Sequence, residues 1–272
     1  MKKTEGADPK IIISPTDLAN HHACSHVTKL ELERLSGRIP PPPVFEDAFL
    51  RMLQDRGRAF EGRVLEQYVR EGKDVVSLEQ SNIEGIPIQS TIEDALVLKP
   101  DVIYQAKLSM PIQNIDTLEF SGKADFIIKN DEGQYEVSDT KLTQSTKVGS
   151  ILQVSLYSEM LTQYTGQTPE KLYIHKFGGE VEEYRIDQTM AYYETIKDDI
   201  FETIHTYHEL AAGQPVNFPI IQDIPEPVAH CSVCAYRMEC HDKRRAAKHL
   251  SLVAGISKNY RERFIAEGHE NT

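Results

Sequence analysis

The chain has 272 residues, of which 40% are hydrophobic and 26% are charged, and its formal net charge is −12. These figures fit a globular chain with a sizeable core, and they exclude disordered, collagen-like and coiled-coil classes. No apolar run approaches the ~20 residues of a membrane-spanning helix, and the chain does not start with a secretory signal. We therefore expect a cytoplasmic protein without membrane contact, and its acidity argues against a general nucleic-acid coat.

Helix and strand signals alternate along the chain. Ser14, Pro15 and Asp17 suit the start of a helix, and the prolines from Pro40 to Pro43 predict an extended break. The pattern then predicts, in order, a helix at 46–70, a strand at 75–78, a helix at 91–98, a strand at 101–106, a hairpin at 121–141, a helix at 149–164, a strand at 172–177 and helices at 191–212 and 250–268. This alternation predicts an α/β fold with a mixed central sheet flanked by helices.

The hairpin is the strongest local signal. A three-residue loop that ends in Gly133 is a favoured connection between two antiparallel strands. The resulting register places Asp125 directly opposite Asp139. It also places Lys123 opposite Lys141, and because side chains alternate faces along a strand, Asp139 and Lys141 point the same way. The turn thus predicts two carboxylates and a lysine close together.

Asp139, Thr140 and Lys141 form a D-x-K tripeptide on the second strand of this hairpin. Hydrolysis of a phosphodiester calls for a divalent cation that screens the phosphate, and Mg²⁺ prefers hard oxygen ligands such as carboxylates. A lysine beside the cation can orient the attacking water and steady the developing charge. Together with Asp125 the tripeptide suits that chemistry, although D-x-K alone also occurs by chance in many chains.

Two helices contribute further candidates. Glu61 shares a helix face with Val64 and Leu65, and a carboxylate on an apolar stripe should be paired or ligating unless it reaches solvent at the edge of the stripe. Gln153 and Tyr157 lie four residues apart, so they project from one face of the helix that follows the D-x-K strand. They could contact a phosphate or hold the lysine and water, or they could have ordinary capping and core roles.

In chain order, the motifs are Gly57-x-x-x-Glu61, Gly122-x-x-Asp125, Asp139-x-Lys141 and Gln153-x-x-x-Tyr157. This order resembles the RecB-like branch of the PD-(D/E)XK nucleases, with Glu61 where those nucleases usually have His. The resemblance implies a restriction-endonuclease-like core, Mg²⁺ or Mn²⁺ as cofactor, and DNA as substrate, single-stranded or at ends. It implies these roles: Glu61, Asp125 and Asp139 as metal ligands, Lys141 as the catalytic lysine, and Gln153 and Tyr157 as further site residues.

Four cysteines are unevenly placed: Cys24 stands alone, and Cys231-x-x-Cys234-x5-Cys240 forms a cluster. Disulfides are not expected in a reducing compartment, which leaves metal ligation or ordinary buried thiols. The pattern is similar to the iron–sulfur nucleases, which include AddB and the CRISPR-associated four-cysteine exonucleases. That resemblance implies a [4Fe–4S] cluster joining the N- and C-terminal segments, and Zn²⁺ is the alternative that four thiolates also suit.

Basic residues outnumber acidic ones next to the last cysteine. They form either a contact with the DNA backbone or a solvated helix face. The candidates for nucleic-acid contact are Arg237, Lys243, Arg244 and Arg245.

The resemblance covers about residues 11–249. It implies a nuclease domain at 1–249 and a helical tail at 250–272. The most similar group, RecB-like nucleases of bacteria and archaea, continues into an RNase H-like domain and sometimes a helicase, so we expect such a partner in cis or in trans. The predicted function is a metal-dependent DNA nuclease, an exonuclease or one directed to single strands or ends, in repair, recombination or defence. The alternative is a weak or inactive nuclease-like DNA-binding module in a helicase–nuclease assembly, and these residues do not distinguish DNA from RNA.

Overall fold

The computed structural model describes residues 1–6, 9–43, 48–81, 83–112, 115, 117–214 and 220–269. It divides into two compact units, the first made of Met1–Ala19 and Glu46–Asp198 and the second of Asn20–Phe45 and Asp199–Thr272. The domain boundary expected after residue 249 falls inside the second unit, and the assignment of 1–249 to one nuclease domain stays a prediction. Among the described residues, no helix is both long and apolar enough to cross a membrane.

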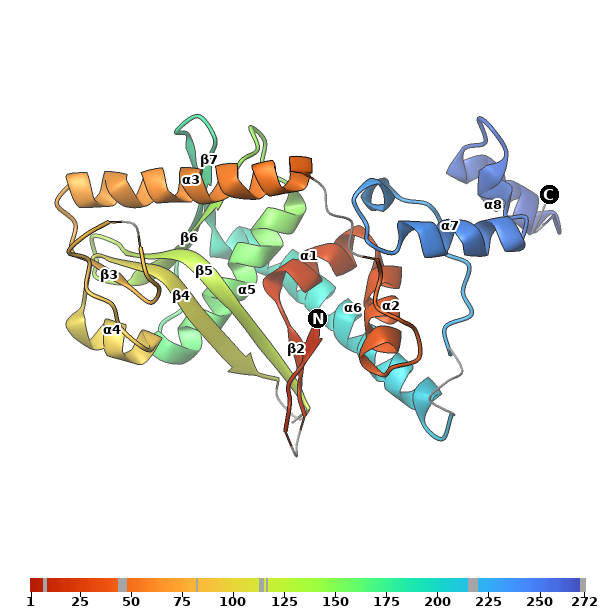
Figure 1. Cartoon of the computed structure of the whole chain (residues 1–272), viewed down its shortest axis with the longest axis horizontal. Coiled ribbons are helices and arrows are strands. Elements are labelled where there is room, and N and C mark those ends of the chain that lie inside the picture. Colours follow the sequence, from red (N-terminus) through yellow and green to blue (C-terminus); the bar gives the residue numbers. More distant parts are fainter. Residues whose placement is uncertain are drawn as a thin grey trace. The chain divides into compact units, whose positions relative to one another are not determined.

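The first unit is built around a mixed sheet (Figure 1). In the described part of the chain, its strands are β1 Lys2–Lys3, β2 Ile11–Ile13, β3 Val75–Ser77, β4 Val102–Pro111, β5 Leu118–Lys129, β6 Tyr135–Lys141, β7 Lys171–Lys176 and β8 Val181–Arg185. One path through the sheet runs β1-β2-β5-β6-β7-β8, while β4 pairs with both β3 and β5. The pairs β2–β5, β3–β4 and β6–β7 are parallel and the others antiparallel, which confirms the predicted mixed sheet.

The long strand β5 has two different partners along one edge. Its Leu118–Phe120 segment pairs with β2, and its Phe126–Lys129 segment pairs with β6. Because β4 pairs with β5 across both of these segments, β2 and β6 must lie on the same, opposite edge. The stretch 121–125 lies between the two ladders. We call it the fork of the sheet, and we include in the fork the side chains of Glu61, Asp139 and Lys141 that are described below.

The predicted hairpin register is confirmed for the pairs that form. The ladder runs from Lys129 opposite Tyr135 to Phe126 opposite Ser138, and Gly133 closes the turn with a φ of 82°. A positive φ of this size favours glycine, which explains the loop sequence. The ladder ends just before the two aspartates, so the pairing expected between the lysines at 123 and 141 is not part of it.

Helices cover the sheet of the first unit. In α3, Ala48–Arg70, the residues Phe60, Val64 and Leu65 pack with Phe126 of β5 and with residues of β3 and β4. The predicted helix at 46–70 corresponds to α3, and residues 46–47 lie outside the described residues. The short helix α4, Ile92–Leu98, starts at a Thr91 cap whose hydroxyl accepts the N–H of residue 94 at 3.1 Å.

Two longer helices follow the hairpin. The helix α5, Val148–Thr165, is buried around most of its circumference and ends at Gly166, which has a φ of 68°. A helix that is apolar all round is typical of one enclosed by other elements. The next helix, α6 Ile186–Ala211, starts five residues before the predicted position, directly after β8.

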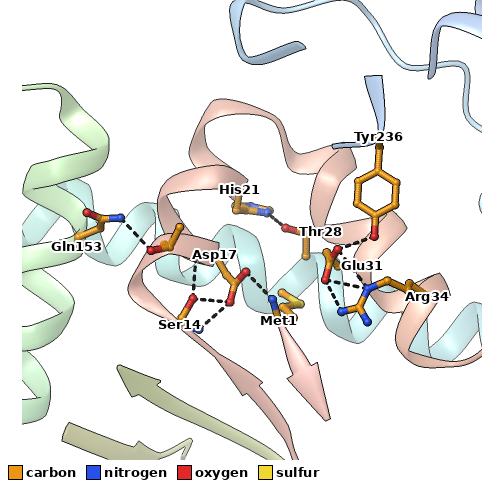
Figure 2. Close-up of polar contacts among 10 residues, drawn as sticks. Met1, Ser14, Asp17, His21, Thr28, Glu31, Arg34, Gln153 and Tyr236 are labelled. Atoms are coloured by element: carbon orange, nitrogen blue, oxygen red, sulfur yellow. Dashed lines mark hydrogen bonds and ion pairs between the residues drawn. The ribbon is translucent and has the colours of Figure 1, made fainter. Parts of the chain in front are cut away.

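The second unit is helical within the described residues. Its elements include the end of α1, Pro15–Ala23, the helices α2 Ser25–Leu35, α7 Arg237–Ala246 and α8 Lys258–Ala266, and the short 3-10 helices η1 Ala229–Ser232 and η2 Leu250–Leu252. Figure 2 shows one polar cluster here: Tyr236 donates to Glu31 at 2.5 Å, and Arg34 donates to the same carboxylate at 2.6 Å. The single helix predicted at 250–268 is interrupted, with Gly255 at a φ of 76° between η2 and α8.

Candidate active site

Asp125 sits at the end of the fork where β5 and β6 separate. Its Oδ2 accepts the backbone N–H of Thr140 at 2.8 Å and the hydroxyl of the same residue at 2.7 Å. The side chain therefore satisfies an amide for which the ladder supplies no partner. Beyond the end of the ladder the two aspartates remain close enough for the charge of Asp125 to act on Asp139.

Asp139 is buried, with 5% of its surface exposed. Its Oδ2 lies 2.5 Å from Lys141 Nζ, an ion pair that confirms the prediction that the two side chains point the same way. This oxygen is itself buried, so the ion pair with Lys141 is shielded from water. Burial and the neighbouring charge of Asp125 raise the pKa of Asp139, against the opposing effect of Lys141. A buried carboxylate with a raised pKa and a second carboxylate beside it would be stabilised by a cation.

Glu61 approaches the same region from α3. It is half-buried, as expected for the edge of the apolar stripe, and its Oε1 accepts a hydrogen bond from Gln105 Nε2. Tyr104 also bonds to this carboxylate, while burial and the charge of Asp125 raise the pKa of Glu61. Asp125 therefore lies within electrostatic range of both other carboxylates.

Gln105 is a site residue that the sequence analysis missed. It interrupts the β4–β5 register, which continues on both sides of it but omits the position opposite Asp125. Its φ is 55°, in the left-handed region that is strained for any residue except glycine. The strain is accompanied by the hydrogen bond to Glu61, so the distorted backbone helps to hold that carboxylate. No local signal marks this residue, because glutamine neither favours a positive φ nor belongs to any motif of the chain.

Tyr157 closes the fork from α5. Its hydroxyl donates to the carbonyl of Lys123 at 2.7 Å, and burial together with the charges of Asp139 and Asp125 raises its pKa, so it stays protonated. A Cβ on Gly122 would lie 2.9 Å from the Tyr157 ring and 2.6 Å from Pro15. Only glycine fits at this position without displacing a neighbour, which gives the Gly122-x-x-Asp125 motif a steric reason.

The remaining motif residues behave differently. The amide of Gln153 donates to the hydroxyl of Thr16 at 3.3 Å, as Figure 2 shows, and this contact directs it to α1 instead of to the carboxylates. A Cβ on Gly57 would meet only Leu142, at an ordinary contact distance of 3.8 Å. Neither placement by itself indicates a role in chemistry.

The fork thus gathers most of the predicted residues but does not complete a cation site. In the described part of the chain, no three Asp, Glu, His or Cys side chains converge as metal ligands do. Glu61 and Gln105 line a cavity of about 790 Å³ together with Lys123, which ion-pairs with Glu79 at 2.6 Å. The Glu61 side of the fork therefore borders a cavity.

A family model of the PD-(D/E)XK nuclease superfamily matches residues 15–241. The chain belongs to this superfamily. Its members are generally metal-dependent phosphodiesterases that typically use Mg²⁺ or Mn²⁺ and bind nucleic acid. No curated protein matches the chain. Among solved structures it is similar to one described as "Crystal structure of SSO0001", with 17% identity and a TM-score of 0.39, over 88% of this chain and 89% of the other.

The four cysteines of this PD-(D/E)XK chain all belong to the second unit. Cys24 caps α2, Cys231 lies in η1, Cys234 follows it and Cys240 is buried in α7; we call these four the cysteine group. Burial and the neighbouring thiols raise the pKa of Cys234 and raise that of Cys240 to about 11. The thiols are near enough to influence one another, although they do not converge on one point among the described residues.

The basic residues near the cysteine group differ in burial and in their contacts. Arg244 is only 6% exposed and donates to the carbonyl of Pro225 at 3.2 Å, so the nucleic-acid contact predicted for it does not fit its placement. Arg237 donates to the carbonyl of Ser232 at 3.3 Å, and Lys243 lies 3.3 Å from Glu239. Arg245 is exposed. The count of basic residues in the sequence could not distinguish exposed side chains from buried ones, because the sequence of a helix does not show which of its arginines is buried.

Proposed function

We propose that the chain is a metal-dependent DNA nuclease of the RecB-like branch, acting on single strands or ends in repair, recombination or defence. The observation that supports this most is the placement of Asp125, within electrostatic range of both Glu61 and Asp139 and next to the Asp139–Lys141 ion pair. A helicase or an RNase H-like domain, in cis or in trans, is the partner that the RecB-like resemblance implies.

The donor chemistry of the fork fits Mg²⁺ or Mn²⁺. Glu61, Asp125 and Asp139 would hold the cation, because carboxylate oxygens are its preferred ligands. Burial and the charge of Asp125 raise the pKa values of Glu61 and Asp139, and a cation would offset both effects. When bound, the cation screens the phosphate and lowers the pKa of the attacking water. The chain's own groups do the rest.

Lys141 would orient the water and steady the charge that develops on the phosphate. Its ammonium is held by Asp139, and its strand is fixed to β5 by the bonds between Thr140 and Asp125. Tyr157 would keep the opposite side of the fork in place through the carbonyl of Lys123. Each contact limits movement of the reacting groups, which is a large part of catalysis by positioning.

The test is cleavage of single-stranded DNA by the full chain with Mg²⁺ or Mn²⁺. We expect Asp139→Ala and Lys141→Ala to abolish cleavage while thermal melting shows a folded protein. Asp187→Ala, which removes an exposed carboxylate paired with Arg185, is the control and should cleave normally. If both site variants cleave as well as the parent chain, the assignment is wrong.

A second candidate is a nuclease-like DNA-binding module without turnover. It is favoured by the incomplete convergence of the carboxylates among the described residues and by Glu61 in place of the usual His. Binding of single-stranded DNA without cleavage, in either metal and at any concentration, would favour this candidate.

For the cysteine group we propose a [4Fe–4S] cluster, with Zn²⁺ as the alternative. The support is the donor set itself: the group consists of cysteines in one unit, and burial together with their mutual influence raises the pKa values of Cys234 and Cys240. Thiolates crowded in this way bind a cationic centre favourably. Such a centre would join α2, near the N-terminus, to η1 and α7.

A further inference from the structure

A second cavity in the first unit uses a different face of α3. Phe60, Arg63 and Arg70 line it from the helix, and His175 and Phe177 line it from β7 and the turn that follows. Its volume is about 380 Å³. We call it the aromatic–basic cavity, and none of the motifs of the chain accounts for it.

The cavity presents an aromatic ring to solvent. Phe177 is 49% exposed, whereas Phe60 beneath it is 7% exposed. The two rings meet edge to face, with centroids 5.8 Å apart and an interplanar angle of 67°. A supported ring with a free face is what single-strand binding proteins use to stack unpaired bases.

The charge of the cavity is opposite to that of the chain as a whole. The guanidinium of Arg63 lies 5.5 Å from the Phe60 ring centroid, and Arg70 stands two turns further along the same helix. Among the described residues that line the cavity, none is Asp or Glu. In a protein of net charge −12, such a site favours an anionic ligand, and guanidinium groups match phosphate oxygens well.

The cavity adjoins the proposed catalytic lysine through the backbone. The N–H of Phe177 donates to the carbonyl of Lys141 at 3.0 Å, and Lys141 Nζ pairs with Asp139. The backbone of Phe177 is therefore fixed directly to the residue that carries the proposed catalytic ammonium.

We propose that the aromatic–basic cavity binds an unpaired base of single-stranded DNA, stacked on Phe177, with a flanking phosphate held by Arg63. The inference rests on the proposed nuclease function, because it assigns the substrate strand of that site. A base inside a duplex is already stacked between its neighbours, so the cavity selects single strands or frayed ends.

The test measures binding without cleavage. The full chain is mixed in EDTA with a short single-stranded oligonucleotide that carries 2-aminopurine, whose fluorescence is quenched by stacking. We expect quenching by the parent chain, and a loss of quenching with roughly tenfold weaker binding for Phe177→Ala. Phe177→Trp should restore both, and Arg63→Gln should weaken binding while leaving the ring in place.

Two controls use exposed residues elsewhere: Phe264→Ala and Arg185→Gln should bind like the parent. The proposal is overturned if Phe177→Ala binds and quenches like the parent, or if Phe177→Trp fails to restore quenching. It is also overturned if Phe177→Ala weakens the binding of blunt duplex DNA as much as it weakens the binding of the single strand. Cleavage is measured separately. If the parent chain does not cleave but Phe177→Ala still weakens binding, the nuclease proposal is contradicted and the base-binding subsite is supported. If the parent chain cleaves but Phe177→Ala binds normally, the subsite is contradicted and the nuclease proposal is supported.

Discussion

The fork of the sheet and the cysteine group both gather side chains that bind cations, but different interactions hold them in place. Each carboxylate of the fork has a polar partner: Thr140 for Asp125, Gln105 for Glu61 and Lys141 for Asp139. The thiols lie in or next to short helices, and Cys231 accepts a long contact of 3.5 Å from the N–H of residue 228. We infer that the fork is organised by the chain itself, whereas the cysteine group depends on what it binds.

The largest effect should come from removing one thiol of the cysteine group, so that the group can no longer hold its proposed metal centre. Because folding and ligand binding are linked, Cys240→Ser should make the second unit at least about tenfold more sensitive to limited proteolysis and leave the first unit protected. Anaerobically purified parent protein should be brown, with about four irons per chain. If the parent protein is colourless and holds one zinc, the bound centre is zinc and not an iron–sulfur cluster. If proteolysis of the variant is unchanged, the cysteine group does not depend on what it binds, and the contrast with the fork is wrong.

Two glycine variants test how tightly the fork is packed. Gly122→Ala should destabilise the chain by about 1–3 kcal/mol, because the new methyl group meets Pro15 and Tyr157. Gly57→Ala, in a helix where the new methyl group meets only Leu142 at an ordinary contact distance, should stabilise the chain by up to ~1 kcal/mol. Denaturant unfolding of both variants checks this, and equal effects would mean that the fork is not tightly packed.

Gln105→Gly separates the backbone strain at this residue from its role in positioning Glu61. Relief of the left-handed backbone should roughly offset the greater freedom of glycine when unfolded, so stability should change by no more than about 1 kcal/mol. Loss of the hydrogen bond to Glu61 should raise the Mn²⁺ concentration needed for cleavage about 10–100-fold. Lys99→Gly is the matched control, because Lys99 has a φ of 53° at the end of α4. An equal metal requirement in both variants would remove Gln105 from the site.

The smallest effect concerns Glu182, which accepts a hydrogen bond from Lys176, the residue before Phe177. Hydrogen bonds from Lys176, Thr146 and Tyr184 lower its pKa from 4.5 to about 2. Its ionised form therefore stabilises the fold fully above pH 4.5, and the benefit disappears as the pH falls towards 2. Glu182→Gln should slightly lower the melting temperature at pH 7, by an amount that shrinks below pH 4.5. A difference that stays constant with pH would contradict this role.

The sequence predicted what local chemistry determines. The turn at Gly133 set the hairpin register, and the register brought Asp125 and Asp139 together. Spacing along α3 likewise predicted that Glu61 borders a buried face. These features depend on a few neighbouring residues, so the sequence is enough to infer them.

The features that were missed depend on long-range packing. Gln105 is strained by its partners, and no residue preference marks it. Arg244 became buried because the carbonyl of Pro225 lies within its reach. The short strands β1, β2 and β8 and the helix α2 were not expected, and the pairing of β2 with β5 gives the fork one of its two sides. The family match confirms the superfamily, while the roles of the individual site residues stay predictions.

The fork is also an opening in the middle of a sheet. An unpaired stretch of strand normally invites another chain to add on, and proteins cover or block such edges. Here the Tyr157 hydroxyl takes the Lys123 carbonyl, Asp125 takes the Thr140 amide, and Pro15 stands against Gly122. The contacts around the proposed active site therefore also occupy this open edge, and we expect a variant such as Tyr157→Phe to lower the solubility of the chain as well as its proposed activity.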